Sequence, residues 1–286
     1  MNRSSIEWTD YTWNPVTGCK HGCIYCYARR LAEGRLKGRF GYDNGFEPTL
    51  HRNRLVEPYN VRKPSRIFVS SMGDLMGEWV PTNWIQLLMP TIWNNPQHTF
   101  QLLTKNPRRY SDFKWPPNVW FGTSIDGNGS SIDRLQELRE VELNWGDAIR
   151  YVSFEPLLAD IASQPEFDLE GIDWIIIGSQ TGPQARQPDK LWYARIIRRA
   201  VRHRIPLFIK DNLEWPDGWT FERPQNFPRI LHNNGVGSRA REHPTYQELH
   251  FDTDKNSNAH KKFVPKHSNP KKKPESHTKG EGESNE

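Results

Sequence analysis

Cysteine is scarce in this chain, and its arrangement excludes a disulfide framework. The 286 residues contain three cysteines, Cys19, Cys23 and Cys26, all within eight positions. An odd number of thiols cannot all pair with one another, and loops of two or three residues are cramped for a disulfide. The three thiols are therefore available for other chemistry.

Long apolar segments are also absent. No run of apolar residues approaches the roughly eighteen that are needed to cross a bilayer. The first eight residues, MNRSSIEW, lack the apolar centre of a secretory signal peptide. These absences argue against a membrane-spanning or exported protein. We expect a cytoplasmic protein, whose thiols stay reduced and free to bind metal.

A strong net charge is missing from most of the chain. The formal net charge is +5 and the pI is about 9.0. However, residues 255–286 hold eight lysines and four glutamates, while residues 1–254 carry 31 basic and 30 acidic side chains. The basic pI is thus no argument by itself for nucleic acid binding. Because the end of the chain has too few apolar residues to offset the entropy lost on folding, we predict a folded domain over 1–240 and a polar, Lys-rich disordered tail over 241–286.

The chain does contain a series of short, continuous apolar runs rich in Val, Ile and Phe. Turn residues and usually a helical pattern follow each run, and this alternation indicates a parallel sheet buried on both faces. The predicted strands are 12–17, 66–71, 99–104, 119–124, 150–154, 174–178 and 206–210. The predicted helices are 23–36, 83–93, 106–113, 132–141 and 191–204, with Thr82 and Asp189 or Pro188 opening two of them.

The alternation predicts an α/β fold. We expect a partial or near-complete parallel (β/α) barrel of six to seven units, with an open doubly wound sheet as the other arrangement of such units. Residues 38–63 have no clear periodicity and are interpreted as an insertion. The glycine-rich run Gly178–Gly182 follows a strand but does not match G-x-G-x-x-G, which argues against a dinucleotide-binding fold.

The cysteine spacing, C-x3-C-x2-C, is typical of thiolates that converge on one inorganic centre. Iron–sulfur clusters are held by closely spaced cysteine thiolates, usually four, so a set of three leaves one iron free for another ligand. The alternative is a zinc site made of the three cysteines and His21 or a distant histidine. His21 lies inside the first loop of the motif, and the two separated ligand pairs usual in zinc modules are absent. The pattern favours a cluster and leaves zinc open.

The segment Gly18–Tyr27, with Tyr25 just before the last cysteine, resembles the signature of the radical S-adenosylmethionine (SAM) superfamily. More specifically, the chain resembles a phage-associated radical-SAM-like family of unknown substrate. The matching stretches cover most of residues 6–212 and are Ile6–Cys19, Phe68–Leu75, Gln101–Arg108, Trp120–Ser124, Ser153–Leu158 and Asp173–Gly178.

This resemblance implies two cofactors, a [4Fe–4S] cluster held by the three cysteines and SAM bound to the fourth iron. One-electron reduction, from a donor such as flavodoxin or ferredoxin, would cleave SAM to methionine and a 5′-deoxyadenosyl radical that abstracts hydrogen from the substrate. The cofactors would carry this chemistry, and the protein would orient them and exclude water and oxygen.

Polar residues follow nearly every predicted strand, and in βα barrels the working residues lie at these strand ends. The resemblance places Ser71, Gly73 and Asp74 in the turn that holds the methionine amino group, although the usual sequence there is Gly-Gly-Glu. Ser124 and Asp126 match by position the residues that bind ribose hydroxyls. The candidate cofactor-binding residues are Tyr25, Ser71, Gly73, Asp74, Lys105, Ser124, Asp126 and Glu155.

Several residues have a second interpretation. Lys105 or Arg109 is suited to neutralise the methionine carboxylate, but we interpret Arg109 as a solvated helix charge. Gln180 stands where the resembled family tends to have the glutamate of Gly-Gly-Glu-Ser-Gly, and an amide cannot act as a base. The arginine stripe of the helix 191–204 is typical of a solvated face, with a phosphate-binding face as the alternative. We expect Trp93, Trp120 and Trp174 in the core.

The sequence therefore favours a radical SAM enzyme of unidentified substrate, with nucleic acid or a nucleotide as our first expectation. The alternative is a non-catalytic zinc- or cluster-containing module that binds nucleic acid. The sequence assigns neither a catalytic residue nor an oligomeric state.

Overall fold

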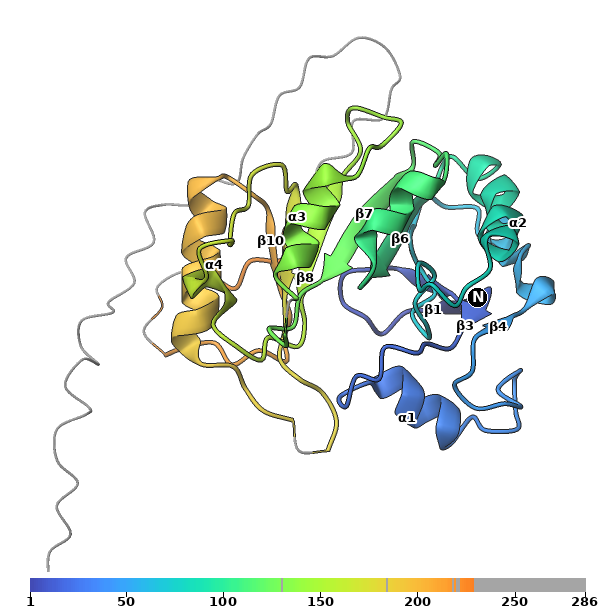
Figure 1. The fold of residues 1–286 in the computed structure, drawn as a ribbon, viewed down its shortest axis with the longest axis horizontal. Helices are drawn as coiled ribbons and strands as arrows, with labels where there is room; N and C mark the ends of the chain where they lie inside the picture. The colour runs from blue at the N-terminus through green and yellow to red at the C-terminus, as the bar shows by residue number, and fades with distance from the viewer. Residues whose placement is uncertain (130, 184, 218, 220–221, 229–286) are drawn as a thin grey trace, which may run out of the picture. The chain divides into compact units, whose positions relative to one another are not determined.

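Seven parallel strands form the centre of the protein in the computed structural model, which describes residues 1–129, 131–183, 185–217, 219 and 222–228 (Figure 1). The strands lie side by side in chain order, and β1 (Asn2–Arg3) pairs antiparallel with the first of them. They are β2 (Tyr11–Trp13), β5 (Arg66–Val69), β6 (Thr99–Thr104), β7 (Val119–Ser124), β8 (Arg150–Phe154), β9 (Trp174–Ile177) and β10 (Leu207–Ile209). The predicted α/β class with a parallel sheet is confirmed.

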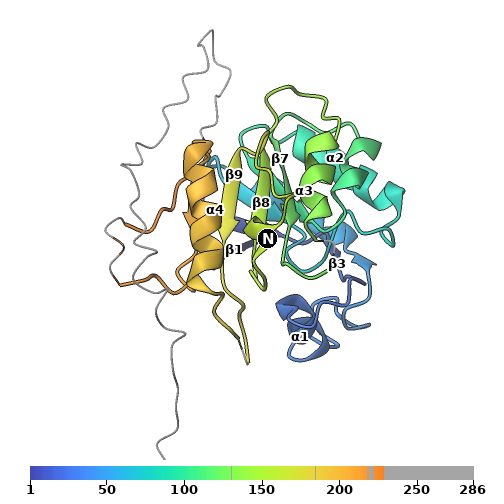
Figure 2. The ribbon, with the colours of Figure 1, turned by 60° about the vertical axis from the view of Figure 1, so that its left-hand side comes forward.

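Helices connect the strands along the outside of the sheet. α2 (Thr82–Trp93), α3 (Asp133–Glu140) and α4 (Lys190–Arg202) follow β5, β7 and β9, and the short 3-10 helices η3 (Pro107–Asp112) and η4 (Ile161–Ser163) follow β6 and β8. Figures 1 and 2 show α2, α3 and α4 running alongside the strands, whereas α1 (Tyr27–Glu33) lies apart from them, beyond one end of the sheet. The repeated strand–helix unit gives part of a (β/α) barrel.

Large rings fill the interior of this partial barrel. In the described part of the chain the strand order begins at β1 and ends at β10, so the sheet is not closed by strand pairing. The segment between β1 and β2 reaches across the open side, since Glu7 Oε2 accepts a hydrogen bond from the Asp211 N–H at 2.8 Å. Trp8, from the same segment, packs inside the sheet in a cluster with Phe68, Trp120, Tyr151, Trp174, Ile176 and Phe208.

The insertion predicted over 38–63 folds back on the strand that leads to the cysteines. Thr49–Leu50 (β4) pairs antiparallel with Val16–Thr17 (β3), and two 3-10 helices, Arg52–Arg54 (η1) and Glu57–Asn60 (η2), follow. His51 is buried, and its Nε2 lies 2.8 Å from Thr17 Oγ1. The insertion therefore supports the start of the cysteine segment.

Five details of the sequence prediction are wrong. The strand expected over 12–17 is two strands, β2 and β3, which belong to different sheets. The helix expected over 23–36 begins only at Tyr27, because the Cys23–Cys26 turn precedes it and Cys26 is its N-cap. The helix expected over 106–113 is 3-10, with Pro107 in its first turn. Thr82 does not cap α2, whose N-cap is Pro81, whereas Asp189 does cap α4 by accepting from the Leu191 N–H. Trp93 is 47% exposed, although Trp120 and Trp174 are buried as expected.

In the described residues, no helix combines the length and the apolar character that crossing a membrane requires. The tail over 241–286 lies outside the described residues, so the boundary at residue 240 and the disorder of the tail stay predictions.

Candidate functional site

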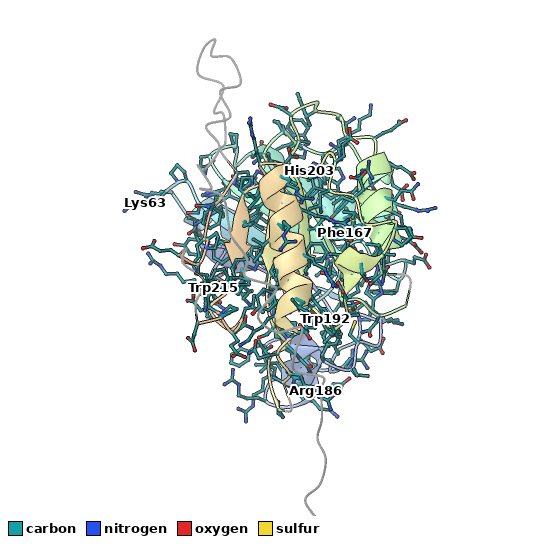
Figure 3. The ribbon with its side chains drawn as sticks, turned by 90° about the vertical axis from the view of Figure 1, so that its left-hand side faces the viewer. Lys63, Phe167, Arg186, Trp192, His203 and Trp215 are labelled. Atoms are coloured by element: carbon teal, nitrogen blue, oxygen red, sulfur yellow. The ribbon has the colours of Figure 1, made fainter. Side chains whose placement is uncertain are left out.

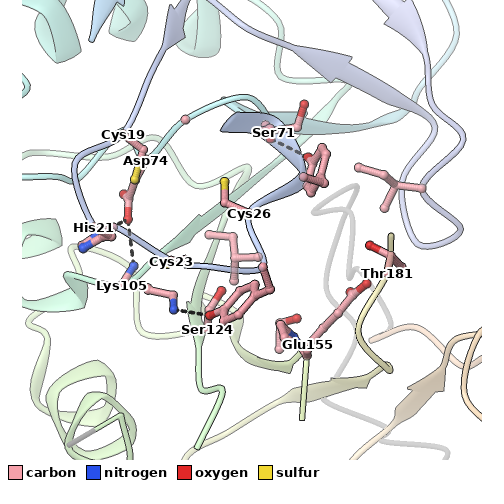
Figure 4. A pocket seen from close by; sticks show the side chains of 18 of the residues that line it. Cys19, His21, Cys23, Cys26, Ser71, Asp74, Lys105, Ser124, Glu155 and Thr181 are labelled. Atoms are coloured by element: carbon pink, nitrogen blue, oxygen red, sulfur yellow. Dashed lines mark hydrogen bonds and ion pairs between the residues drawn. The ribbon is translucent and has the colours of Figure 1, made fainter. Parts of the chain in front are cut away.

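A pocket of about 420 Å³ lies where the carboxyl ends of the parallel strands meet the cysteine segment. Polar residues at the carboxyl ends of six of the seven parallel strands line it, among them Ser71, Lys105 and Ser124 (Figure 4). Residues of the N-terminal segment line it as well. Of the residues predicted for the site, the pocket is lined by Cys19, Cys23, Tyr25, Cys26, Ser71, Gly73, Asp74, Lys105, Ser124 and Glu155. Asp126 does not line it but binds two residues that do.

Two glycines let the cysteine segment approach the sheet. Gly18 has φ +88° and donates its N–H to Met72 O at 2.9 Å. Gly73 lies against it, and a Cβ atom on Gly73 would be 2.8 Å from Gly18 O. Only glycine fits such contact between two backbones. Gly73 therefore has a structural role beside the cysteine segment.

The three thiols line one pocket, as a shared inorganic centre would require. Among the described residues, no three His, Cys, Asp or Glu side chains are grouped so that they could hold one metal ion. Ligands of a cluster bind different irons and are spaced more widely than ligands of one ion, so they need only face the same cavity. Burial, and then the negative charges of Asp74, Cys23 and Cys26, raise the pKa of Cys19 to about 12. A cationic centre bound here would favour the thiolate form of Cys19.

Asp74 is buried and ties the cysteine segment to two strands. Its Oδ2 lies 2.7 Å from His21 Nε2 and accepts the Lys105 N–H at 2.9 Å. Its Oδ1 accepts from Thr104 Oγ1 at 2.6 Å and from the Met76 N–H at 3.0 Å. Burial alone raises the pKa of a carboxyl, but the hydrogen bonds led by that of His21 outweigh it and hold the pKa of Asp74 below its usual value. With four partners, Asp74 supports the site more than it offers a free ligand atom.

Tyr25, Lys105 and Asp126 form a second network on the cysteine segment. The Tyr25 hydroxyl donates to Asp126, while Lys105 Nζ donates to the Tyr25 hydroxyl at 2.5 Å and pairs with Asp126. Burial alone would raise the pKa of Asp126. The hydrogen bonds from Lys105 and Tyr25 outweigh this effect and hold the pKa below its usual value. Burial, and then the hydrogen bond to Asp126, raise the pKa of Tyr25. A neutral phenol, an ammonium and a carboxylate thus meet at one edge of the pocket.

Glu155 and Lys210 form an ion pair on another wall of the pocket. They follow β8 and β10, and Gly178 at the end of the intervening β9 lies beneath them. A Cβ atom on Gly178 would be 3.0 Å from Lys210 Cδ and 3.1 Å from Glu155 Cδ. The glycine therefore makes room for the two side chains to meet across a strand. Gln180 lines the pocket close by in sequence.

Arg109 differs from the sequence interpretation, whereas the arginines of α4 lie on a face that is exposed or partly exposed, as expected. Arg109 is not solvated: its side chain is 12% exposed and donates to the carbonyls of Gly77 and Val80, outside the residues that line the pocket. On α4, Arg195 pairs with Asp160, and Arg199 donates to Phe167 O at 2.6 Å. Figure 3 shows α4 running from Trp192, at the end where α1 lies, to His203 at the far end. At least two arginines of the stripe are thus bound to the protein itself.

Sequence reasoning missed some residues of the pocket. His21 was considered only as a zinc ligand, and its contact with Asp74 had no signal in the sequence. Ser5, Ile6, Trp8 and Phe46 line the pocket from segments without periodicity. The rule that working residues follow the strands places Lys210 at the site. Its pairing with Glu155 depends on Gly178, which only the structure places between them.

Fold and site define an α/β protein with a thiol-lined pocket at the carboxyl ends of a parallel sheet. The chain belongs to the family described as "Protein of unknown function (DUF5131)", whose model matches residues 3–264. No curated protein matches the chain.

Solved structures of spore photoproduct lyase share a distant likeness. A mutant with bound AdoMet and dinucleoside spore photoproduct aligns with 13% identity and a TM-score of 0.42, over 70% of this chain and 63% of that chain. A second mutant aligns with 10% identity and a TM-score of 0.46, over 73% and 78%. The chain thus spans less than two thirds of the first of these proteins. A likeness of this size carries no property of those proteins to this chain.

Proposed function

We propose that this protein is a radical SAM enzyme in which Cys19, Cys23 and Cys26 hold a [4Fe–4S] cluster. One observation carries the proposal: the only three cysteines of the chain, spaced C-x3-C-x2-C, line a single pocket at the carboxyl ends of the strands. Such strand ends are where βα barrels place their working residues. The resemblance to a phage-associated radical-SAM-like family, drawn from the sequence, belongs to the same proposal.

The cluster and SAM together would supply a 5′-deoxyadenosyl radical on one-electron reduction, from a donor such as flavodoxin or ferredoxin. The residues of the chain would bind and orient. Ser124 lines the pocket and Asp126 lies next to it, both suited to hydrogen-bond hydroxyl groups. Lys105 Nζ carries the positive charge that favours a carboxylate at this edge.

The N-terminal segment would shield the reaction from water. Trp8 and Phe68 line the pocket, and both are almost completely buried. Their ring centroids are 4.7 Å apart, so they form a packed apolar wall. An apolar wall in the same pocket as the thiols suits chemistry that water and oxygen would quench.

The test is anaerobic reconstitution of the full chain with iron and sulfide. We expect a brown protein with about four irons per chain whose visible absorbance bleaches with dithionite, and SAM cleavage to 5′-deoxyadenosine on reduction. A protein that binds one zinc ion and no iron would instead be the non-catalytic module, and the proposal would be wrong.

A further inference from the structure

The segment around the cysteines is much more basic than the rest of the described chain. From Lys20 to Arg39 it carries six Lys and Arg residues against one Glu residue. Residues 1–254 as a whole are close to neutral, so this positive charge is concentrated in one part of the sequence. Arg35, Lys37 and Arg39, here called the basic turn, are exposed, and none forms an ion pair with the described residues.

One short helix separates the basic turn from the cysteines. The turn follows directly on α1, whose seven residues span roughly 10 Å from the cysteines. Buried Tyr42 and Phe46 fold the chain after the turn back onto α1, in a cluster that Cys19 and Cys26 join. Positive charges without an ion-pair partner among the described residues thus lie one short helix away from the thiol-lined pocket.

α1 also forms the rim of the pocket. Arg30 Nη2 donates at 3.2 Å to the carbonyl oxygen of Thr181, a residue that lines the pocket, and Gly182 leaves space for its guanidinium. Tyr27 lines the pocket and is 41% exposed, while its hydroxyl donates to Ser71 O at 2.5 Å. Since that hydrogen bond fixes the ring, Tyr27 offers a preformed aromatic surface on which a flat group can stack.

The Glu155–Lys210 pair offers a hydrogen-bond acceptor beside a donor. Their side chains are 22% and 11% exposed, so the pair is largely removed from water, and both residues line the pocket. A buried ion pair is weak evidence for stability, because apolar residues would often serve the fold equally well. An acceptor next to a donor complements the edge of a nucleobase, where amino or imino N–H groups adjoin carbonyl or ring acceptors.

We propose that the pocket takes one base of a nucleic acid strand, with its phosphates held by the basic turn and its base read by Glu155 and Lys210. Enzymes that modify a base extrude it from the stack into a pocket, and the flanking phosphates then lie over the rim. An acidic peptide would satisfy the basic turn but not the stacking ring and the paired donor and acceptor. This inference deepens the proposed function and rests on it only for the chemistry inside the pocket.

The phosphate half is tested by fluorescence anisotropy with labelled single-stranded DNA and RNA of about 12 nucleotides, and with the DNA duplex. The full chain is used, iron-free and reconstituted, without SAM or reductant. The variant is Arg35→Glu/Lys37→Glu/Arg39→Glu. Its matched control, Lys63→Glu/Lys114→Glu/Arg202→Glu, reverses three exposed charges that precede β5, β7 and β10, at the opposite end of the strands.

We expect the basic-turn variant to bind a single strand about tenfold more weakly, or weaker still. The plot of log K against log salt concentration should become less steep by about 2, which corresponds to three lost phosphate contacts. The affinity of the control variant for a single strand should stay within about twofold of that of the wild type. No binding of any strand by the wild type, equal loss in both variants, or equally tight binding of polyglutamate would overturn the inference. RNA, DNA and duplex affinities identify which nucleic acid is preferred.

The base half is tested with Glu155→Gln and Lys210→Met on dA, dC and dT homo-oligomers. We expect the wild type to rank these bases with differences of about fivefold or more, and each variant to lose the ranking without changing the salt slope. Asp160→Asn breaks an ion pair outside the pocket and should keep both the ranking of the bases and the salt slope. A ranking that survives in both pocket variants would contradict the assignment, and melting temperatures show that the variants are folded.

The two proposals fail separately. A protein that cleaves SAM but binds no nucleic acid keeps the proposed function and refutes this inference. A protein that binds strands with the expected salt slope and base ranking but holds no cluster would keep the inference and refute the radical mechanism.

Discussion

The Nε2 atom of His21 lies 2.7 Å from Oδ2 of Asp74, which joins the loop between Cys19 and Cys23 to the turn after β5. The same carboxylate accepts the Lys105 N–H at the end of β6. One buried side chain therefore fixes the cysteine loop relative to two strands. This contact explains how a loop without regular structure can hold three thiols beside the sheet.

Asp74→Asn should destabilise the protein and weaken cluster retention together. The amide cannot accept all four hydrogen bonds, and unpaired buried donors cost about 1–3 kcal/mol each. We expect a lower unfolding free energy by this amount and iron lost faster to a chelator. Chemical unfolding and timed chelation measure the two effects, with exposed Asp112→Asn as the control. Unchanged iron retention in a destabilised variant would contradict the anchoring role.

Asp126→Ala and Ser124→Ala should each weaken SAM binding to the reconstituted protein. Loss of one hydrogen-bond partner in the site costs roughly 1–3 kcal/mol, or about 5- to 150-fold in the dissociation constant. Asp126→Ala should have the larger effect, because it also frees Tyr25 and Lys105 from their shared partner. Equilibrium binding measures this, with exposed Ser111→Ala as the control; two variants with wild-type affinity would exclude a role of this edge in SAM binding.

Gly178→Ala should disturb the Glu155–Lys210 pair. The added Cβ would be 3.0 Å from Lys210 Cδ and 3.1 Å from Glu155 Cδ. Overpacking of this kind costs about 1–3 kcal/mol. Thermal unfolding should therefore show a lower melting temperature, while exposed Gly146→Ala, with no neighbour within 4 Å, should show little change. Equal melting temperatures would mean that the pair moves aside without cost.

The stability of the folded domain should fall with pH below neutrality, in part through His51. Burial, and then the charge of Arg54, lower the pKa of His51 from 6.5 to about 4. Between these pH values the unfolded chain binds more protons than the folded one, so the unfolding free energy falls as the pH falls, by at most about 1.4 kcal/mol per pH unit for this group. His98, whose pKa burial also lowers, acts in the same direction.

His51→Gln isolates the first contribution. We expect the unfolding free energy of this variant to depend less steeply on pH than that of the wild type between pH 4 and 6.5, with the two slopes equal above that interval. Denaturant unfolding across the interval provides both curves. Parallel curves would show that His51 is not neutral in the folded protein.

The strands could be predicted because buried parallel strands are continuous apolar runs. Thr99–Thr104, Val119–Ser124 and Arg150–Phe154 have the predicted bounds. The helix bounds failed where local chemistry overrides periodicity, as at Cys23–Cys26, where a turn delays α1. Trp93 fits the apolar pattern of α2 but lies at its last residue, where the helix leaves the core and the ring is 47% exposed.

The pocket could be predicted only in part. Strand order places the residues after each strand at one edge, which is why Lys105, Ser124 and Glu155 line one cavity. Which residues pair with one another depends on side-chain reach across strands, as for Glu155 and Lys210 over Gly178. The guanidinium of Arg109 donates to the carbonyls of Gly77 and Val80. Nothing in the sequence around Arg109 distinguishes this bound arginine from a solvated one.

The most direct test of the account is the EPR spectrum of the reduced, reconstituted protein before and after addition of saturating SAM. Three cysteine ligands leave one iron for SAM, so we predict a cluster signal in the wild type that changes on adding SAM, and no signal in Cys19→Ala/Cys23→Ala/Cys26→Ala. A spectrum unchanged by SAM, or iron and sulfide retained by the triple variant at the wild-type level, would contradict the radical SAM assignment.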